Sequence, residues 1–288
     1  MPFRVNTNTD ALQAYYQLAK VNAETTKAQM RLSSGKRIMS VADDTSGFNV
    51  GTSLKGKVAV MKGAQSNISA AKNMLSTAEG GLLGINDLLT KIEGKLSDAT
   101  NPTNDRNALA SDIKALSEEI KSILTNTKFN NAQLLSGSDV AAGDKFRFQV
   151  GEFSDNLDLD FAVNLASSGA ATGGTDVSSE LDKFTGVVLG SLTNTTGVGA
   201  LNTALSNIKT EVTDSLGKIG NMVQRLDIKD ETLNTSIANA ESSISRLFDA
   251  DMAMEQLNAT RGSILQQAGT AMLAQLNMAP QQVLQLFG

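Results

Sequence analysis

The sequence predicts a mostly α-helical protein made of long antiparallel, coiled-coil helical rods, with paired N- and C-terminal helices and a small β-hairpin insertion. Two observations support this fold class. Apolar residues recur at alternating steps of three and four along most of the chain, which is the pattern of helices packed along a seam. One short region in mid-chain alternates apolar and polar residues instead, which is typical of a β-hairpin.

The longest seam predicts a helix from about Val58 to Ala99. At 1.5 Å per residue this helix would be roughly 60 Å long, far longer than the helices of most compact domains. Glycines within it each cost about 1 kcal/mol relative to alanine, so packing against neighbours must offset them. Asn101-Pro102 ends the helix. The seam consists of Ala64, Ile68, Ala71, Leu75, Ala78, Leu82, Ile85, Leu89, Ile92 and Leu96.

Two further helices complete the rods. A second helix is expected from near Asn104, with a seam from Leu109 to Ile123, and the pair Asn130-Asn131 breaks it. A third seam runs from Leu201 to Leu247, so its helix matches the first in length. Short connections between such helices make neighbouring ones antiparallel.

The region between the rods carries the β-hairpin. One strand is predicted over Phe146 to Val150 and the other over Leu157 to Val163, with Gly151 to Asn156 as the turn. The following segment, from Ser167 to Ser179, is rich in Gly, Ser, Thr and Ala without periodicity, which indicates a surface loop.

Both chain ends are amphipathic and predicted to be helical. The last stretch is unusually apolar for a chain end, and an exposed apolar patch marks an interaction site. Docking of both ends on the body of an all-α monomer is the alternative, but long seams fit self-assembly better. The predicted self-association residues are Leu12, Tyr16, Ala19, Ala23, Met30, Met254, Leu257, Ile264, Ala268, Met272, Leu276 and Leu284.

Composition excludes several classes of function. The 288 residues hold 25 Lys+Arg and 30 Asp+Glu, and neither His nor Cys. Without imidazole or thiol, an enzyme would depend on carboxylates, lysine or hydroxyls, and these show no converging arrangement. We therefore predict no enzyme, no cofactor and no metal site. The net charge of −5 argues against a nucleic-acid or anionic-membrane partner, and no apolar run is long enough to span a membrane.

The stretch from Arg31 to Ile38 near the N-terminus and the stretch from Ile264 to Thr270 near the C-terminus resemble the bacterial flagellins. The stretch from Arg31 to Ile38, followed by Asp43 to Gly47, is similar to the N-terminal signature of that family. The stretches from Ile264 to Thr270 and from Pro280 to Leu284 resemble its C-terminal signature. Hook-filament junction proteins share these terminal signatures, so they are one alternative. A non-polymerising secreted helical adhesin is another.

The resemblance implies a structural subunit that polymerises into the flagellar filament and transmits motor torque as a helical propeller. It implies an inner-tube coiled coil of residues 1–45 with 245–288, and an outer-tube helical domain of residues 46–136 with 186–244. Residues 137–185 would form the hairpin and surface loop, with no large outer domains. The expected location is a secreted flagellar filament outside the cell, with a periplasmic flagellum left open.

The resemblance also implies partners. Besides copies of itself, the chain would meet an export chaperone at its apolar C-terminus, the filament cap and hook-associated proteins. The charged residues Lys36, Arg37, Asp43 and Asp44 fall within the N-terminal signature. They are candidates for salt bridges between subunits or for a polar connection between two helices, and the sequence does not separate these roles.

Overall fold

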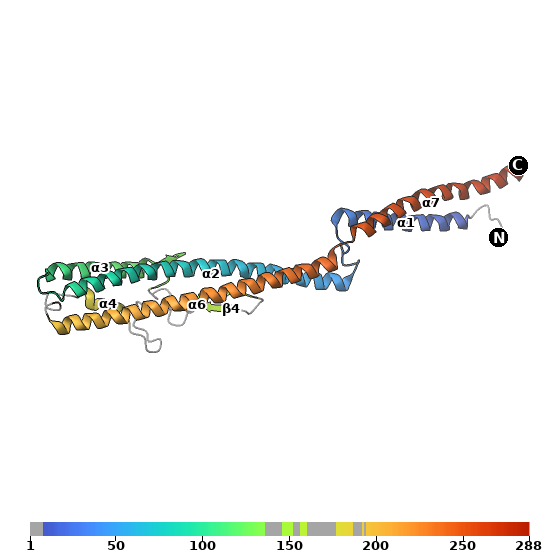
Figure 1. Cartoon of the computed structure of the whole chain (residues 1–288). Coiled ribbons are helices and arrows are strands. Elements are labelled where there is room, and N and C mark those ends of the chain that lie inside the picture. Colours follow the sequence, from blue (N-terminus) through green and yellow to red (C-terminus); the bar gives the residue numbers. More distant parts are fainter. Residues whose placement is uncertain are drawn as a thin grey trace. The chain divides into compact units, whose positions relative to one another are not determined.

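The computed structural model describes residues 8–135, 146–151, 156–159, 177–186, 192 and 194–287, and almost all of them are helical. The chain divides into two units (Figure 1). Unit 1 comprises Met1–Val58 with Ala238–Gly288, and unit 2 comprises Ala59–Ile237. The mostly α fold class with long paired helices is therefore confirmed.

Unit 2 is built around two long antiparallel helices. Helix α2 spans Thr45–Asp98 and helix α6 spans Thr195–Phe248, and both also supply residues to unit 1. Ion pairs link them at two levels: the ammonium of Lys72 lies 2.8 Å from the carboxylate of Asp227, and that of Lys209 lies 2.6 Å from Glu93. Helix α3 (Arg106–Asn126) and the short helix α4 (Val177–Thr185) belong to the same unit.

The core of unit 2 follows the heptad seams of the sequence. Along α2 the side chains at these positions are fully buried from Ile68 to Ile92, as are Ile113 and Ile120 of α3 and Ile208 and Val212 of α6. Burying a large aliphatic side chain is worth about 1.5–3 kcal/mol. The seam therefore supplies the stabilisation that offsets the glycines in α2.

Helix α2 begins earlier than predicted, at Thr45 rather than near Val58. Its first turn is capped by Asp44, whose carboxylate accepts a hydrogen bond from the backbone N–H of Gly47 at 2.8 Å. The sequence pattern missed these turns because their main contact is made by a glycine. A Cβ on Gly51 would lie 1.9 Å from the ring of Phe248, so the ring occupies the space where a side chain would be.

Two small antiparallel sheets lie in unit 2. Strands β1 (Lys128–Phe129) and β2 (Ala132–Gln133) flank Asn130 and Asn131, which both have positive φ, at 48° and 69°. Asparagine tolerates this conformation, and it suits a two-residue hairpin turn. Strands β3 (Phe146–Gln149) and β4 (Asn156–Leu159) pair with Phe146 opposite Leu159, which confirms the predicted β-hairpin.

The predicted surface loop is wrong at its C-terminal end. Ser178 and Ser179 lie in α4, which starts at Val177. Val177, Leu181 and Phe184 are buried at helical spacing, and the apolar pattern of such a short helix is concealed by the serines between them. Residues 167–176 of the predicted loop, and Phe161 and Val163 of the predicted strand, lie outside the described residues.

Unit 1 is dominated by a pair of terminal helices. Helix α1 spans Thr9–Ser34 and helix α7 spans Met252–Phe287. They run antiparallel: the guanidinium of Arg31 lies 3.1 Å from the carboxylate of Glu255, and the side-chain amide of Asn8 donates to the backbone carbonyl of Leu276. The predicted pairing of the two terminal helices is confirmed.

A short break separates α6 from α7. Asp251 accepts hydrogen bonds from the backbone N–H groups of Ala253 and Met254, so it acts as the N-cap of α7. The apolar pattern runs across this point without interruption, and the break therefore depends on capping rather than on hydrophobicity. Within the described part of the chain, no helix combines the length and hydropathy needed to cross a membrane.

Candidate self-association surface

The contact between α1 and α7 is made by small and polar side chains. Thr25 and Ala28 of α1 are 5% exposed, and Glu255 and Ala259 of α7 are 8% exposed. These positions are offset by one or more residues from the apolar seams expected from the sequence. The terminal helices are therefore paired as predicted, but through different faces, because the pattern of large apolar residues does not detect a seam of Thr, Ala and Gly.

Glycines bring the two backbones close together. A Cβ on Gly262 would lie 2.1 Å from the hydroxyl of Thr25, and a Cβ on Gly269 would lie 2.9 Å from Leu18. The Thr25 hydroxyl is itself fixed, since it donates to the backbone carbonyl of Val21 at 2.7 Å. An added Cβ at Gly262 would force Thr25 to move, whereas one at Gly269 meets the end of the flexible Leu18 side chain.

Because the pair closes mainly on its small residues, most of its large apolar residues face outward. Leu12 is 54% exposed, Tyr16 is 64% exposed and Ile264 is 61% exposed. We call the exposed apolar residues of α1 and α7 the outward surface. Ten of the twelve residues predicted for self-association belong to it: Leu12, Tyr16, Ala19, Ala23, Met30, Met254, Leu257, Ile264, Ala268 and Met272.

The other two predicted residues differ. Leu276 is half-buried, and its carbonyl accepts the hydrogen bond from Asn8, so it belongs to the contact between the two helices. The side chain of Leu284 lies outside the part of the chain that the structure describes, although its backbone is helical.

The outward surface also contains residues that the sequence analysis missed. Tyr15, Met252, Leu265 and Met278 are all about half exposed. The rings of Tyr15 and Tyr16 pack edge to face, with centroids 6.2 Å apart. Tyr15 and Leu265 are each adjacent in sequence to a predicted residue, so including the neighbours of the predicted positions would have identified them.

One part of this surface is concave. Leu257, Thr260, Arg261, Ile264 and Leu265 line an open hollow of about 330 Å³ on α7. The lining is mostly apolar, and three of its members are exposed leucine or isoleucine side chains.

Charge is unevenly distributed along the terminal helices. Arg261 is the last charged side chain of the sequence, so the segment from Gly262 onward has no Asp, Glu, Lys or Arg. Its polar residues are Gln, Asn, Ser and Thr. Contacts made by this part of α7 therefore depend on shape, apolar area and neutral hydrogen bonds.

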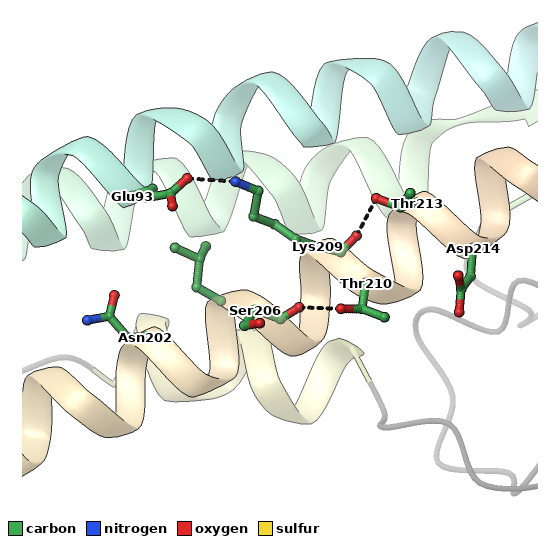
Figure 2. A pocket seen from close by; sticks show the side chains of 8 residues that line it. Glu93, Asn202, Ser206, Lys209, Thr210, Thr213 and Asp214 are labelled. Carbon is green, nitrogen blue, oxygen red and sulfur yellow. Dashed lines mark hydrogen bonds and ion pairs between the residues drawn. The ribbon is translucent and has the colours of Figure 1, made fainter.

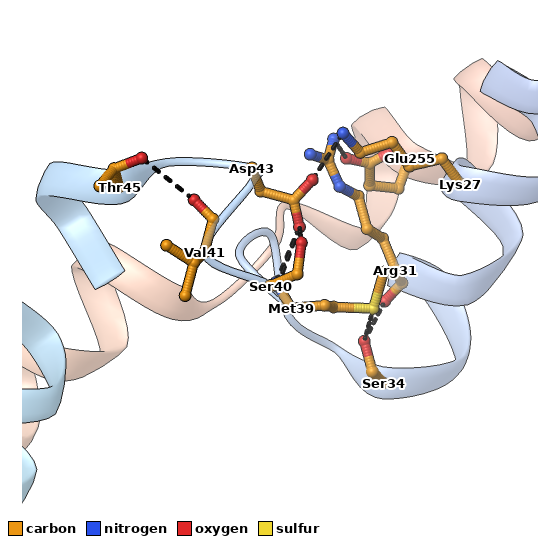
Figure 3. Close-up of polar contacts among 9 residues, drawn as sticks. All are labelled: Lys27, Arg31, Ser34, Met39, Ser40, Val41, Asp43, Thr45 and Glu255. Atoms are coloured by element: carbon orange, nitrogen blue, oxygen red, sulfur yellow. Dashed lines mark hydrogen bonds and ion pairs between the residues drawn. The ribbon is translucent and has the colours of Figure 1, made fainter. Parts of the chain in front are cut away.

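A polar cluster connects α1 to α2 (Figure 3). The carboxylate of Asp43, whose side chain is 8% exposed, lies 2.6 Å from the ammonium of Lys27 and accepts hydrogen bonds from the backbone N–H groups of Met39 and Ser40. The Lys27 hydrogen bond, followed by these backbone donors, holds the pKa of Asp43 well below its usual range. The carboxylate is therefore charged throughout the neutral range and fixes the connection.

The remaining charged candidates occupy the same connection. The side chain of Arg37 donates to the backbone carbonyl of Leu247 at 2.9 Å, and its backbone N–H donates to that of Phe248 at 2.6 Å. Lys36 forms a β-bridge with Asp249, and its side chain is exposed. Lys36, Arg37, Asp43 and Asp44 thus all take part in contacts within unit 1, and the side chains of Lys36 and Arg37 also remain accessible.

Phe248 closes this connection from the other side. Its side chain is 3% exposed, lies against Gly51 and packs edge to face on Phe48 with ring centroids 6.1 Å apart. The ammonium of Lys55 lies 3.9 Å from the centre of its ring, a favourable cation–π contact. The backbone N–H of Ala250 also donates to the carbonyl of Gly35 at 2.9 Å, so one buried ring and two backbone hydrogen bonds join the break between α1 and α2 to the break between α6 and α7.

An open groove of unit 2 does not form a comparable site. It has a volume of about 450 Å³ and lies between α2 and α6 (Figure 2). Its Lys209 is paired with Glu93, and the hydroxyls of Thr210 and Thr213 donate to backbone carbonyls of α6. Among the described residues, no group of three metal-ligating side chains converges anywhere.

Comparison with protein families supports the role suggested by the two ends. Residues 5–139 match the bacterial flagellin N-terminal helical region, and residues 200–287 match the bacterial flagellin C-terminal helical region. Together these regions cover most of the chain, including α1, α2, α3, α6 and α7.

Relatives that match almost the whole chain are also flagellins. The chain is 30% identical to a flagellin of Halalkalibacterium halodurans over 98% of both chains, and 28% identical to a flagellin of Listeria innocua over 98% of this chain and 99% of the relative. Flagellin FlaB1 of Treponema pallidum is 26% identical over 98% of this chain.

A solved structure shares the fold. A putative flagellar hook-associated protein from Vibrio parahaemolyticus superposes with a TM-score of 0.55 and 18% identity, covering 72% of this chain and all of that one. At this identity the likeness concerns the fold alone. The two family regions, the full-length relatives and the terminal helix pair with its exposed apolar surface lead to one conclusion: the chain belongs to the bacterial flagellins and is a structural subunit of the flagellar filament.

Proposed function

We propose that the outward surface of α1 and α7 is where copies of this flagellin contact one another in the filament. The observation that carries the proposal is the exposure of large apolar side chains on both helices, led by Tyr16, Ile264 and Met254. Among the described residues of unit 2, by contrast, only Leu83 and Ile228 are large, apolar and strongly exposed. Water-exposed apolar area concentrated on one unit is covered when subunits associate.

The face used within the subunit supports this assignment. Since Thr25, Ala28, Ala259 and Gly262 supply the buried contacts of the helix pair, the exposed large apolar residues of α1 and α7 are not needed for the fold of unit 1. Large side chains that do not stabilise the subunit are available for contacts between subunits. The hollow on α7 would receive such a side chain from a neighbouring copy. Repetition of a contact that does not close on itself produces a helical polymer.

We further propose that residues 1–45 with 245–288 form an inner-tube coiled coil, and that residues 46–136 with 186–244 form the surrounding helical layer. Residues 137–185 would lie on the filament surface. The long helices α2 and α6, with their continuous buried seam, would give the filament the stiffness needed to transmit motor torque as a propeller.

The polar connection has a second proposed role. The side chains of Lys36 and Arg37 are exposed, whereas Asp43 is enclosed by Lys27 and two backbone donors. The two cations are therefore the members of the cluster suited to meet a carboxylate on a neighbouring subunit, while Asp43 and Asp44 shape the connection itself.

Further partners are expected at the same surfaces. Before assembly the apolar side chains of α7 would need a cover, so an export chaperone is proposed to bind there. The filament cap and hook-associated proteins are proposed to contact the terminal helices as a neighbouring subunit does. A chaperone footprint on α7 would be seen as slower amide hydrogen exchange in that helix when the chaperone is added.

A matched pair of substitutions tests the self-association surface. Ile264 of α7 and Ile228 of α6 are exposed to a similar extent, 61% and 64%. Ile264→Asp would bury an unpaired carboxylate between subunits, which costs several kcal/mol, and each 1.4 kcal/mol is tenfold in affinity. We expect at least about a hundredfold rise in the critical concentration for elongation of filament seeds. Ile228→Asp should elongate seeds normally.

The readout is sedimentation of elongated seeds together with negative-stain electron microscopy, and circular dichroism confirms that both variants remain helical. Ala268→Trp should also abolish elongation, since Ala268 is exposed in the subunit and the larger side chain disturbs only the packing between copies. Normal filaments from Ile264→Asp would refute the proposed surface. Loss of filaments from both aspartate variants would show that the contact between subunits also includes the surface of unit 2 around Ile228.

A further inference from the structure

The methionines of this chain are concentrated on the outward surface. The sequence has ten methionines and no cysteine. Among the methionines that the structure describes, the exposed ones are 48–58% exposed and all lie in unit 1, namely Met30, Met252, Met254, Met272 and Met278. Unit 2 holds Met61, Met74 and Met222, and each of these is at most 9% exposed.

From this distribution we propose that the five exposed methionines are sulfoxidation sites, and that their oxidation by a hydroperoxide switches off the assembly of free subunits. The inference rests on the proposed function of the outward surface. It adds a reversible chemical control to that surface and names the class of oxidant that acts on it.

The chemistry is a two-electron oxidation. The thioether sulfur donates a lone pair to one oxygen of hydrogen peroxide, an S–O bond forms and the O–O bond breaks. The second oxygen leaves as water after proton transfer, so the thioether becomes a sulfoxide and the peroxide is reduced. Methionine sulfoxide reductase reverses the step: two thiols are oxidised to a disulfide, and the sulfoxide oxygen leaves as water.

Exposure makes the reaction selective. Oxidation of methionine requires access to its sulfur, which Met61, Met74 and Met222 do not offer. Met39 is half-buried, and its sulfur accepts a hydrogen bond from the hydroxyl of Ser34 at 3.3 Å (Figure 3). Because the chain lacks cysteine, no thiol competes for the peroxide or forms a disulfide.

The consequence for assembly follows from polarity. A sulfoxide carries a strong dipole and a hydrogen-bond acceptor, whereas methionine is a flexible apolar side chain that adapts to irregular contacts. Burial of such a group between subunits without a donor opposes association. The folded subunit is unaffected, since none of the five side chains is buried within it. In a completed filament the same side chains would be covered and protected.

The test compares two chains with and without hydrogen peroxide, followed by peptide mapping and seeded elongation. One is the native chain, and the other carries Met30→Leu, Met252→Leu, Met254→Leu, Met272→Leu and Met278→Leu. Peroxide should raise the critical concentration of the native chain at least about tenfold and leave that of the leucine variant unchanged. A control variant with Met61→Leu, Met74→Leu and Met222→Leu should remain as sensitive as the native chain.

A second measurement does not depend on the variants. Treatment of oxidised native chain with methionine sulfoxide reductase and a dithiol should restore elongation, and preformed filaments should show less sulfoxide at the five positions than free subunits. Unchanged elongation by native chain that is fully sulfoxidised at these positions would overturn the inference, and so would equal loss in the leucine variant. Failure of untreated native chain to elongate seeds would instead overturn the proposed surface, and this inference with it.

Discussion

The closest contact between the terminal helices gives a sharp prediction. Gly262→Ala adds one methyl group to α7, and that carbon would lie 2.1 Å from the hydroxyl oxygen and 3.0 Å from the Cβ of Thr25. The Cβ belongs to the stem of Thr25, so rotation of the side chain does not remove the whole overlap. The helices must separate or α1 must shift.

Two unfavourable contributions and one favourable contribution decide whether Gly262→Ala stabilises or destabilises the helix pair. Overpacking a tight contact costs about 1–3 kcal/mol, and moving the Thr25 hydroxyl away from the carbonyl of Val21 costs about 1 kcal/mol more. Replacing glycine by alanine within a helix gains about 1 kcal/mol. The expected net loss in the stability of the helix pair is therefore about 2 kcal/mol, close to a thirtyfold increase in its opening.

Amide hydrogen exchange of peptides from α7, read by mass spectrometry, measures this opening directly. Gly56→Ala is the matched control, because Gly56 is also a helical glycine of unit 1 and a Cβ there meets nothing within 4 Å. That variant should be stabilised by about 0.5–1 kcal/mol. Thr25→Ala combined with Gly262→Ala should recover most of the lost protection, since Thr25→Ala removes the hydroxyl, which is the atom nearest to the added methyl group.

Equal or slower exchange in α7 of Gly262→Ala would refute the close approach of the two helices. A double variant as unprotected as Gly262→Ala alone would show that Thr25 is not the residue in the way. Non-additivity of at least about 1 kcal/mol between the two substitutions is the quantitative signature of a direct contact.

Three further predictions concern the connection and the ion pairs. Phe248→Ala should destabilise unit 1 by about 3–4 kcal/mol, seen as rapid proteolysis at the break between α6 and α7, whereas Phe248→Leu should be cleaved far more slowly. Asp43→Asn should cost about 1 kcal/mol at neutral pH, because it weakens the contact with the half-exposed Lys27. Since the folded pKa of Asp43 is depressed, this difference from the native chain should be constant above about pH 4.5 and shrink as the pH falls below its unfolded pKa, which urea titrations at several pH values would show. The pKa of Lys72 is raised, chiefly by its hydrogen bond to Asp227, so the small loss in Lys72→Met, under about 1 kcal/mol, should persist below pH 10 and vanish only as the pH rises above the ordinary lysine value of 10.5.

The sequence was sufficient where large apolar side chains make the contacts. The seam of α2 was assigned residue by residue, and Ile68, Leu82 and Ile92 are fully buried. It was insufficient where contacts depend on the absence of a side chain. The backbone at Gly51 lies against the ring of Phe248, and the backbone at Gly262 lies against the side chain of Thr25. A hydrophobic pattern does not count glycine as a contact position, so it misses both.

The candidate surface shows the same limit. Periodicity identified the apolar stripes of α1 and α7 but did not indicate whether they faced the partner helix or the solvent. Two neighbouring stripes of a helix are both compatible with a coiled coil. Close packing selects the stripe that contains Thr25 for the helix pair and leaves the stripe that contains Met30 exposed. The sequence also did not predict the hydrogen-bond partners of Asp43, because they include backbone N–H groups whose positions depend on the fold of the connection between α1 and α2.

Under the proposed assembly, the uncharged part of α7 bears on how the filament responds to its ionic medium. Dissolved salt weakens interactions between charges over a Debye length of about 10 Å at 0.1 M, but it does not weaken apolar contacts. Contacts made beyond Arg261 therefore keep their strength in dilute and in concentrated solutions alike. Any dependence of assembly on ionic strength must then originate in charged residues elsewhere in the chain, among them Glu255 and Arg261 of α7, so the proposed filament contains a salt-insensitive contact alongside others that respond to salt.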